Sequence, residues 1–475
     1  MQEISLKKLQ SEELHYEYKS ARGGLPGSIW ETYSAFANTD GGYIYLGIDE
    51  PKKRQYTPAG LSLSDIEDLK TNLFNTVNNK DKVSINLLTD DNLEVLKVDN
   101  CYVLKVRIDK CSAQLKPVYI NNNVYKGTYR RNADGDYHCS VEEINAMIRD
   151  SNIKASDIVM LEDHDISSID YESVQRYKNL FASIHVNHPF LKEGDERFLE
   201  FVGAAKLNKN NEYKLTKAGL LMFGYSYRIV YEYSDYFLDY QKIGNGDKRW
   251  EDRIESTSGT WSGNVFTFFE KVLERLTGST PNPFETEGLF RRDSGMYFAL
   301  REALCNTLCN ADYLLPGGVV IKHYRNYVDF KNPGCLMMDI NQMIKGGDSL
   351  PRNKTMLKMF NLIGIGERAG GGVPLIYSVA KDNSLSLPLY EEGYSPDYTL
   401  LHLNIKKGGD EKVEGLTQIE HDILNYLRDN TPRSAKEISE YLNKNITTVK
   451  LSLYDLVDKS YISTSGTIRD KKYFL

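Results

Sequence analysis

Three acidic residues near the amino terminus have the types and spacing of a metal-binding site. Glu17 and Lys19 lie in a segment whose apolar and polar side chains alternate, so a strand would direct both to one face. Asp49 ends the next β-rich run and comes close to Glu17 if the two strands are neighbours. Together with Glu12, these carboxylates could hold Mg²⁺ or Mn²⁺. Since Glu12 and Glu17 are five residues apart, the triad requires a bend near Glu13.

A second set of residues, in the carboxyl-terminal half, has the types that could bind magnesium and phosphate. Glu302 and Asn306 are four residues apart on a predicted helix, so they share a face. There a carboxylate could activate water and an amide could hold magnesium. Residues 367–376 form a glycine-rich loop that leads into a helix, and the amides of such a loop can cradle phosphate. The alternative is that residues 364–372 form only a flexible loop.

The elements that must position the acidic residues follow a strand, helix, strand order. Residues 14–19 alternate as one strand, and residues 43–48 form another. Between them, apolar side chains recur at helical spacing, at Ile29, Tyr33 and Phe36. Further strands are predicted over 83–88, 93–98, 102–108, 117–120 and 124–131. Capping patterns predict helices that begin after Ser64 and after Ser140.

The amino-terminal motifs are similar to a known domain family. The segments EYK (17–19) and AFANTDGGYIYLGID (35–49) resemble the Schlafen-type AlbA-like domain, which is often met in bacterial transcriptional regulators and RecG-like ATP-binding proteins. Some members of the wider Schlafen group are metal-dependent ribonucleases of tRNA and other RNAs. Their acidic triad maps onto Glu12, Glu17 and Asp49 by motif, although these acids also occur in members with no known cleavage.

The resemblance gives the basic residues of this domain a role as well. It implies that Lys19 lies in the catalytic site, and that a strand ending in arginine closes the domain beside the acids. Lys126, Arg130 and Arg131 form the densest basic cluster and would contact phosphate there. The alternative is a solvated strand edge that is defended by charge.

Four motifs in the second half resemble the divergent GHKL-type ATP-binding domain. They are REALCN (301–306), NPG (332–334), PRN (351–353) and GIGERAGGG (364–372). The resemblance implies that ATP is bound by Glu302, Asn306, Asn332, Gly334, Gly370, Gly371 and Gly372, with Asn306 also holding the metal. Where the family usually reads NAxxHRDY, residues 306–313 read NTLCNADY and lack the histidine and arginine. We therefore expect nucleotide binding to be retained more readily than hydrolysis.

The carboxyl-terminal residues form a separate unit after a short linker at 406–410. Three helical patterns followed by a hairpin with Gly466 at its turn predict a winged helix-turn-helix. Its third helix would present Thr447, Thr448, Lys450 and Ser452 to the major groove, and its wing would place Arg469, Lys471 and Lys472 near phosphate. The unit has about as many acidic as basic residues, so protein docking or dimerisation is the alternative.

Composition narrows the class of protein. The 475 residues are 41% hydrophobic and 26% charged, with a net charge of −7. These values are typical of a soluble multidomain protein that could bind nucleic acid only through local patches. Neither a membrane-length apolar run nor a secretory signal is found, so we expect a cytoplasmic protein without membrane partners. Six scattered cysteines indicate neither a zinc site nor a disulfide framework.

These observations predict an α+β multidomain protein. The expected parts are a Schlafen-type nucleic-acid domain (1–151), a mixed connecting scaffold (152–290), a GHKL-like α/β sandwich (291–407) and a winged helix (411–475). We expect a homo-oligomer that responds to ATP and binds RNA or DNA, in its sharper form a Mg²⁺- or Mn²⁺-dependent endonuclease with a role in phage defence. The alternatives are a non-catalytic, ATP-binding transcriptional regulator, and an ATPase that acts as a conformational switch with Glu302 as its general base.

Overall fold

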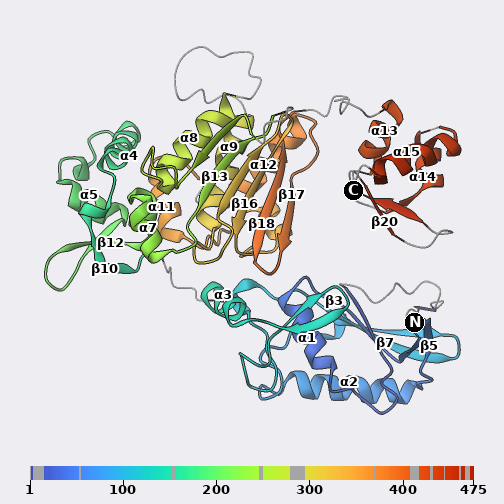
Figure 1. The fold of residues 1–475 in the computed structure, drawn as a ribbon. Helices are drawn as coiled ribbons and strands as arrows, with labels where there is room; N and C mark the ends of the chain where they lie inside the picture. The colour runs from blue at the N-terminus through green and yellow to red at the C-terminus, as the bar shows by residue number, and fades with distance from the viewer. Residues whose placement is uncertain are drawn as a thin grey trace. The chain divides into compact units, whose positions relative to one another are not determined.

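The computed structural model divides the chain into two compact units, Met1–Ile405 and Lys406–Leu475 (Figure 1). Several sheets and many helices make it a mixed α+β multidomain protein, as predicted. The structure describes residues 2–3, 15–52, 55–151, 157–244, 250–278, 295–366, 370–406, 417–427, 432–442, 444–458, 462–465 and 471–474.

The first sheet of the larger unit is built around the predicted strand, helix, strand order. Strand β2 (Tyr16–Lys19) pairs in parallel with β3 (Gly42–Leu46), and helix α1 (Ile29–Asn38) connects them. The sheet has five strands in the order β1-β6-β7-β3-β2, where the others are β1 (Gln2–Glu3), β6 (Leu93–Val98) and β7 (Cys101–Ile108). The predicted apolar face of α1, Ile29, Tyr33 and Phe36, is buried against it.

Helix α2 (Leu63–Val77) covers the same core with Leu69, Leu73 and Val77. Its capping residue is Ser62, whose hydroxyl accepts from the Asp65 amide while the Asp65 carboxylate accepts from the Ser62 amide. The prediction of a cap at Ser64 was therefore wrong by two residues. An Asp in place of the usual Glu or Gln closes the same reciprocal pattern.

The strands predicted after residue 83 are only partly confirmed. Residues 93–98 and 102–108 lie in β6 and β7, but 83–88 contributes only an isolated bridge between Val83 and Ile120. The predicted pairing of 117–120 with 124–131 is likewise reduced to one bridge, Tyr119 to Thr128. Instead, β8 (Tyr129–Asn132) pairs with β9 (Gly135–His138). Helix α3 (Val141–Ser151) follows, capped at Ser140 as predicted.

A small mixed region continues the larger unit. Its three-stranded sheet has the order β10-β12-β11 and consists of β10 (Met160–Asp165), β11 (Ala205–Leu207) and β12 (Tyr213–Thr216). The helices here are α4 (Tyr171–Ile184), α5 (Asp195–Val202), α6 (Lys217–Phe223) and α7 (Ser226–Glu232). Gly224 ends the buried helix α6.

A six-stranded sheet forms the largest layer. Its order is β14 (Asp252–Glu255), β13 (Leu238–Lys242), β15 (Val319–His323), β16 (Tyr327–Pro333), β18 (Tyr398–Asn404) and β17 (Leu389–Gly393). Helices pack beside it (Figure 1): α8 (Val265–Thr277), α9 (Gly295–Asn310) and α12 (Gly372–Asp382). Two of its strands precede residue 290, so the expected domain boundary there runs through this sheet. Two short helices, α10 (Ile340–Lys345) and α11 (Lys354–Leu362), lie between β16 and α12 in the sequence.

The smaller unit has its own apolar core. Its helices are α13 (Gln418–Tyr426), α14 (Ala435–Leu442) and α15 (Ile446–Asp458). Its three-stranded sheet has the order β19 (Arg433–Ser434), β21 (Lys472–Phe474), β20 (Ser463–Ser465). Ile423, Ile438, Val449 and Leu453 are buried between these elements. The predicted hairpin turn at Gly466 lies outside the described residues.

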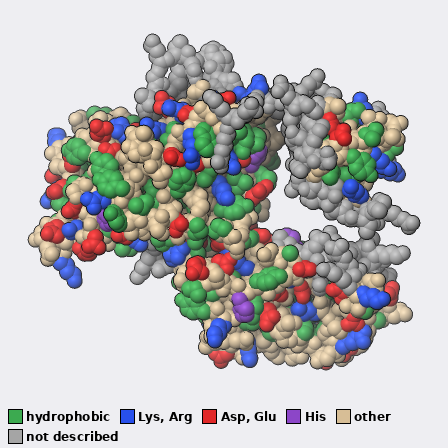
Figure 2. Space-filling view, in the orientation of Figure 1, with side chains coloured by type: hydrophobic (Ala, Val, Ile, Leu, Met, Phe, Trp, Pro, Cys, Tyr) green, Lys and Arg blue, Asp and Glu red, His purple; other side chains and the backbone are tan. Residues whose placement is uncertain are grey.

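The surface shows no large area of one charge on the side drawn in Figure 2, where acidic and basic side chains are interspersed over the described residues. Of the helices that the structure describes, none has the length and apolar character needed to cross a membrane.

Candidate functional site

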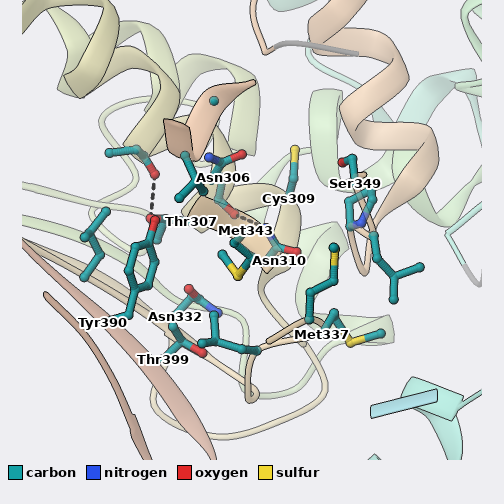
Figure 3. A pocket seen from close by; sticks show the side chains of 18 of the residues that line it. Asn306, Thr307, Cys309, Asn310, Asn332, Met337, Met343, Ser349, Tyr390 and Thr399 are labelled. Atoms are coloured by element: carbon teal, nitrogen blue, oxygen red, sulfur yellow. Dashed lines mark hydrogen bonds between the residues drawn. The ribbon is translucent and has the colours of Figure 1, made fainter. Parts of the chain in front are cut away.

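A pocket lies between helix α9 and the six-stranded sheet. It encloses about 920 Å³ of empty space, part of which is open to solvent. Figure 3 shows its two sides, with Asn306, Thr307 and Asn310 from α9 opposite Asn332, Tyr390 and Thr399 from the sheet. Glu302, Gly370 and Gly372 also line it. The structure therefore brings together residues that the sequence predicted as nucleotide ligands from segments far apart in the chain.

Glu302 is buried in this pocket with one carboxylate oxygen unsatisfied. Its side chain is 1% exposed. Oε1 accepts from Arg301 Nη2 at 3.0 Å and from the Gly366 amide at 3.3 Å. Oε2 has no hydrogen-bond partner among the described residues, which omit 367–369. A buried acceptor without a donor is unfavourable, so this oxygen fits a water molecule or another donor brought by a ligand.

The glycine segment that opens α12 faces these groups. A Cβ atom at Gly372 would lie 3.1 Å from Glu302 Oε2 and 3.3 Å from Asn306 Nδ2. Gly370 has φ +66°, and a Cβ there would lie 2.1 Å from the Asp348 carbonyl oxygen. Gly371 is the N-cap of α12 and offers no side-chain cap. Backbone amides at such a helix start suit phosphate oxygens, so the donor set fits a nucleotide, and Asn306 is the residue that could hold its metal.

The NPG and PRN motifs contact each other beside the pocket. Gly334 has φ +93°, and a Cβ there would lie 2.8 Å from Arg352 Nη1. Arg352 Nη2 donates to the Cys335 carbonyl at 3.0 Å, and Thr399 Oγ1 donates to the Gly334 carbonyl at 2.8 Å. Only glycine fits here, because the guanidinium occupies the space that a side chain would need.

Several pocket residues were not predicted from the sequence. They are mostly apolar or sulfur-containing: Cys309, Met337, Met338, Met343, Leu350 and Tyr390. Such residues equally suit a core, and the signal was the Leu336-Met337-Met338 run, which follows NPG after Cys335. Asn310 stands where the family has histidine, and its Nδ2 donates to the Asn306 carbonyl at 2.8 Å (Figure 3).

The acidic site of the first sheet is closed by cations. The Glu17 side chain is 13% exposed and accepts from Lys19 Nζ at 2.8 Å and from Arg131 Nη2 at 2.9 Å. Asp49 is paired with Arg22 instead. Glu12 lies outside the described residues, and within those that are described no group of three or more acidic, histidine or cysteine side chains is arranged for a metal. That Glu17 and Lys19 share a face of the strand was predicted, whereas the pairing of Glu17 with Arg131 was not.

Arg130 and Arg131 are buried in ion pairs. Arg130 binds Asp397 and lies 3.3 Å from Glu143, while Arg131 donates to Asp136 at 2.8 Å as well as to Glu17. The alternative of a solvated strand edge was therefore wrong for both arginines. A phosphate reaches either guanidinium only if these pairs open, so the predicted phosphate contact stays a prediction. Lys126 is exposed.

In the smaller unit, Thr448 and Lys450 are exposed on α15. Ser452 is buried, so its predicted outward position was wrong. Lys471 Nζ lies 5.3 Å from the centre of the Tyr454 ring. Arg469 lies outside the described residues.

Three family models match the chain. "Schlafen, AlbA_2" matches residues 12–140, and "Putative ATP-dependent DNA helicase recG C-terminal" matches residues 317–396. A domain of unknown function matches residues 145–239. The recG C-terminal match includes the NPG, PRN and glycine motifs but begins after Glu302 and Asn306. No curated protein matches the chain.

Two solved structures are also similar. The DIP2311 protein from Corynebacterium diphtheriae is 13% identical, and the match covers 95% of this chain and 91% of that one with a TM-score of 0.41. The N-terminal domain of a "Putative ATP-dependent DNA Helicase RecG-related Protein" from Nitrosomonas europaea is 26% identical over 28% of this chain and 86% of that one, with a TM-score of 0.21. At these scores neither likeness bears on the arrangement of the whole chain. The family matches identify two segments: the chain combines a Schlafen, AlbA_2 domain at 12–140 with a domain of the recG C-terminal type at 317–396, as its motifs predicted.

Proposed function

We propose that this chain acts on nucleic acid through its Schlafen domain, under the control of ATP bound between α9 and the six-stranded sheet. The observation that carries the proposal is the pocket itself, where the unpaired oxygen of Glu302 and the Asn306 amide face the glycine-lined start of α12. Asn306 would hold Mg²⁺, the first amides of α12 would bind phosphate, and Asn332 with the methionine-rich wall would bind the base. When bound, the nucleotide supplies negative charge and a cleavable phosphate.

The residues of α9 favour sensing over rapid hydrolysis. Glu302 would accept a proton from water. Asn310 replaces the family histidine and has its own amide bound to the helix backbone. A neutral amide cannot exchange protons as imidazole does, so we propose that ATP works mainly as a conformational ligand. The ATPase-switch alternative instead requires turnover that is lost in Glu302→Ala.

The sharper form of the proposal is a metal-dependent endonuclease of RNA, tRNA or DNA, with a role in phage defence. Glu17 and Asp49, with Glu12, would hold Mg²⁺ or Mn²⁺, and Lys19 would contact phosphate. Because Glu17 is paired with Lys19 and Arg131, metal binding there requires these contacts to rearrange.

A second candidate function is a non-catalytic transcriptional regulator that acts as a homo-oligomer. The observation in its favour is the order of the described elements in the smaller unit, three helices and a three-stranded sheet, which would suit a winged helix. Thr448 and Lys450 on the exposed side of α15 would then read DNA.

The first test is ATP binding by titration calorimetry with Mg²⁺. Asn306→Ala is expected to weaken binding by about 100-fold, since one charge-assisted metal contact is lost. Asn210→Ala, in an exposed turn, is the matched control. Unchanged binding in Asn306→Ala would disprove the pocket assignment.

The second test separates the two candidate functions. Labelled tRNA, single-stranded RNA and duplex DNA are incubated with Mn²⁺ or EDTA, with and without ATP. Cleavage that requires metal and disappears in Glu17→Ala and Asp49→Ala identifies the nuclease. Binding without cleavage, with preference for one duplex sequence, identifies the regulator.

A further inference from the structure

The turn between β17 and β18 inserts acidic side chains against the Schlafen domain. We call residues 392–397 the acidic turn. The Asp397 carboxylate binds both terminal nitrogens of Arg130, with 2.8 Å between Oδ2 and Nη2, and each side chain is only 8% exposed. Glu392 is paired with Lys110. A two-pronged contact of this kind between guanidinium and an oxyanion is made equally well by carboxylate and by phosphate.

Two further contacts fix the acidic turn in this position. Tyr394 Oη donates to Asp40 at 2.7 Å, and its ring centre lies 4.9 Å from the Arg130 guanidinium carbon. Ser395 Oγ donates to Glu143 at 2.7 Å. The turn is therefore seated by specific contacts on the Schlafen domain and not by charge alone.

Three cations of the Schlafen domain converge beneath this turn, Lys110, Lys116 and Arg130. Lys116 is buried, and its Nζ donates to the Asn38 carbonyl at 2.8 Å. Burial, followed by repulsion from Lys110, lowers the pKa of Lys116 to about 8. Arg130 Nε has no hydrogen-bond partner among the described residues. Lys110 and Arg130 contact four carboxylates, those of Asp40, Glu143, Glu392 and Asp397, and the acidic turn supplies two of these four. Without the turn, the three cations would face two carboxylates, which suits a polyanion.

The acidic turn is also tied to the wall of the nucleotide pocket. The Gly334 amide donates to the Asp397 carbonyl at 2.9 Å, and the Leu336 amide donates to Glu392 Oε1 at 2.8 Å. Leu336 lines the pocket, and so does Thr399, whose hydroxyl binds the Gly334 carbonyl. A ligand that displaces Leu336 or Thr399 would therefore also displace Glu392 and Asp397, the two residues that pair with Lys110 and Arg130.

We propose that Lys110, Lys116 and Arg130 form a binding patch for nucleic-acid phosphates, which the acidic turn occupies as an internal competitor until ATP displaces it. The inference rests on the proposed function and adds to it the phosphate site and the means by which ATP would control it. It also explains how a buried arginine can serve a surface ligand, because its present partner is a carboxylate that phosphate would replace.

The test uses the full chain and a fluorescein-labelled 20-nucleotide single-stranded RNA, with affinity measured by anisotropy. Without ATP, the Glu392→Gln/Asp397→Asn double variant is expected to bind at least about tenfold more tightly than wild type, because the competitor is neutralised. Glu391→Gln/Asp382→Asn removes the same charge from exposed positions and is the matched control. Adding Arg130→Met to the double variant is expected to abolish the gain.

The possible results of this RNA-binding test distinguish failure of the patch from failure of the ATP site. Equal affinity of the double variant and the control pair overturns the inference, as does a gain that survives Arg130→Met. Absence of RNA binding in all variants, with ATP binding intact, also overturns the patch but leaves the nucleotide pocket standing. A gain in a protein that does not bind ATP supports the patch and disproves the proposed control.

Two additional measurements guard against misfolding. Glu392→Gln alone is a milder variant, since Lys110 is 31% exposed and remains hydrated, and it is expected to give a smaller gain in the same direction. Hydrogen exchange in wild type should show that Mg²⁺ and ATP deprotect both 389–398 and 129–138, but not in Asn306→Ala. Unchanged protection of both segments on saturation with ATP contradicts displacement of the turn.

Discussion

The carboxylates of Glu17 and Glu302, both in the larger unit, differ in the partners that neutralise and hydrogen-bond them. Glu17 is surrounded by the chain's own cations, Lys19 and Arg131, at hydrogen-bonding distance. Glu302 is more deeply buried, yet one of its oxygens has no partner among the described residues. Within the described residues, the Glu17 carboxylate has cationic partners without a ligand, whereas the Glu302 carboxylate keeps one oxygen without a partner.

This difference indicates how each site should respond to its ligand. A metal at Glu17 must compete with two ion pairs, so binding there is coupled to a local rearrangement. A donor at Glu302 meets an oxygen that is already desolvated and in place, so little reorganisation is needed. We therefore expect ATP to bind in the pocket without a prior rearrangement. Metal binding at Glu17 is expected only after the contacts with Lys19 and Arg131 have rearranged.

The largest expected effect comes from neutralising each carboxylate in turn. Glu17→Gln should lower the free energy of unfolding by about 2 kcal/mol, because it weakens charge-assisted hydrogen bonds to Lys19 and Arg131. Glu302→Gln should change it by less than about 1 kcal/mol, because the buried charge it removes is only half satisfied. Urea denaturation followed by circular dichroism measures both. Equal losses in the free energy of unfolding would show that the Glu17 and Glu302 carboxylates are equally well satisfied by their partners.

A smaller effect is expected from filling the glycine cradle. Gly372→Ala places a methyl group 3.1 Å from Glu302 Oε2 and should weaken ATP binding by about tenfold, or about 1.4 kcal/mol, with little change in stability. Gly27→Ala, where the new methyl group meets no atom within 4 Å, is the control. Calorimetric titration with ATP gives the answer, and wild-type affinity in Gly372→Ala would argue against phosphate at this helix start.

The smallest effect is a pH trend at the cationic patch. The pKa of Lys116 is lowered to about 8, below its ordinary value of 10.5, so between these two values the unfolded chain binds the extra proton. Stability contributed through Lys116 therefore rises with pH across this window and is lowest below it. The melting temperature of Lys116→Met relative to wild type should fall from pH 8 to pH 10. A difference in melting temperature that stays constant with pH would mean that the surroundings of Lys116 do not lower its pKa.

Short-range patterns predicted much of the fold. The apolar spacing of Ile29, Tyr33 and Phe36 predicted α1 and its buried face, and the capping pattern at Ser140 predicted the start of α3. Residues 83–88 have strand composition but pair only through Val83, because composition cannot show which edge of a sheet is available.

The electrostatics of the sites could not be predicted in the same way. Arg130 and its partner Asp397 are 267 residues apart, and no local pattern joins them. The motif resemblance placed Glu302, Asn306 and the glycines in one pocket, but the unsatisfied oxygen of Glu302 depends on three-dimensional packing. Charge signs are visible in a sequence, whereas the partner of each charge is set by the tertiary fold.

Asp397 contributes to two contacts through different parts of the same residue. Its carbonyl accepts from Gly334 beside the nucleotide pocket, and any amino acid offers a carbonyl. Its carboxylate binds Arg130, and few side chains can replace it. Aspartate and asparagine codons differ by a single base. A lineage could therefore lose the Asp397–Arg130 contact in one mutational step while its ATP site stayed intact, which would weaken the control that ATP exerts over the Schlafen domain.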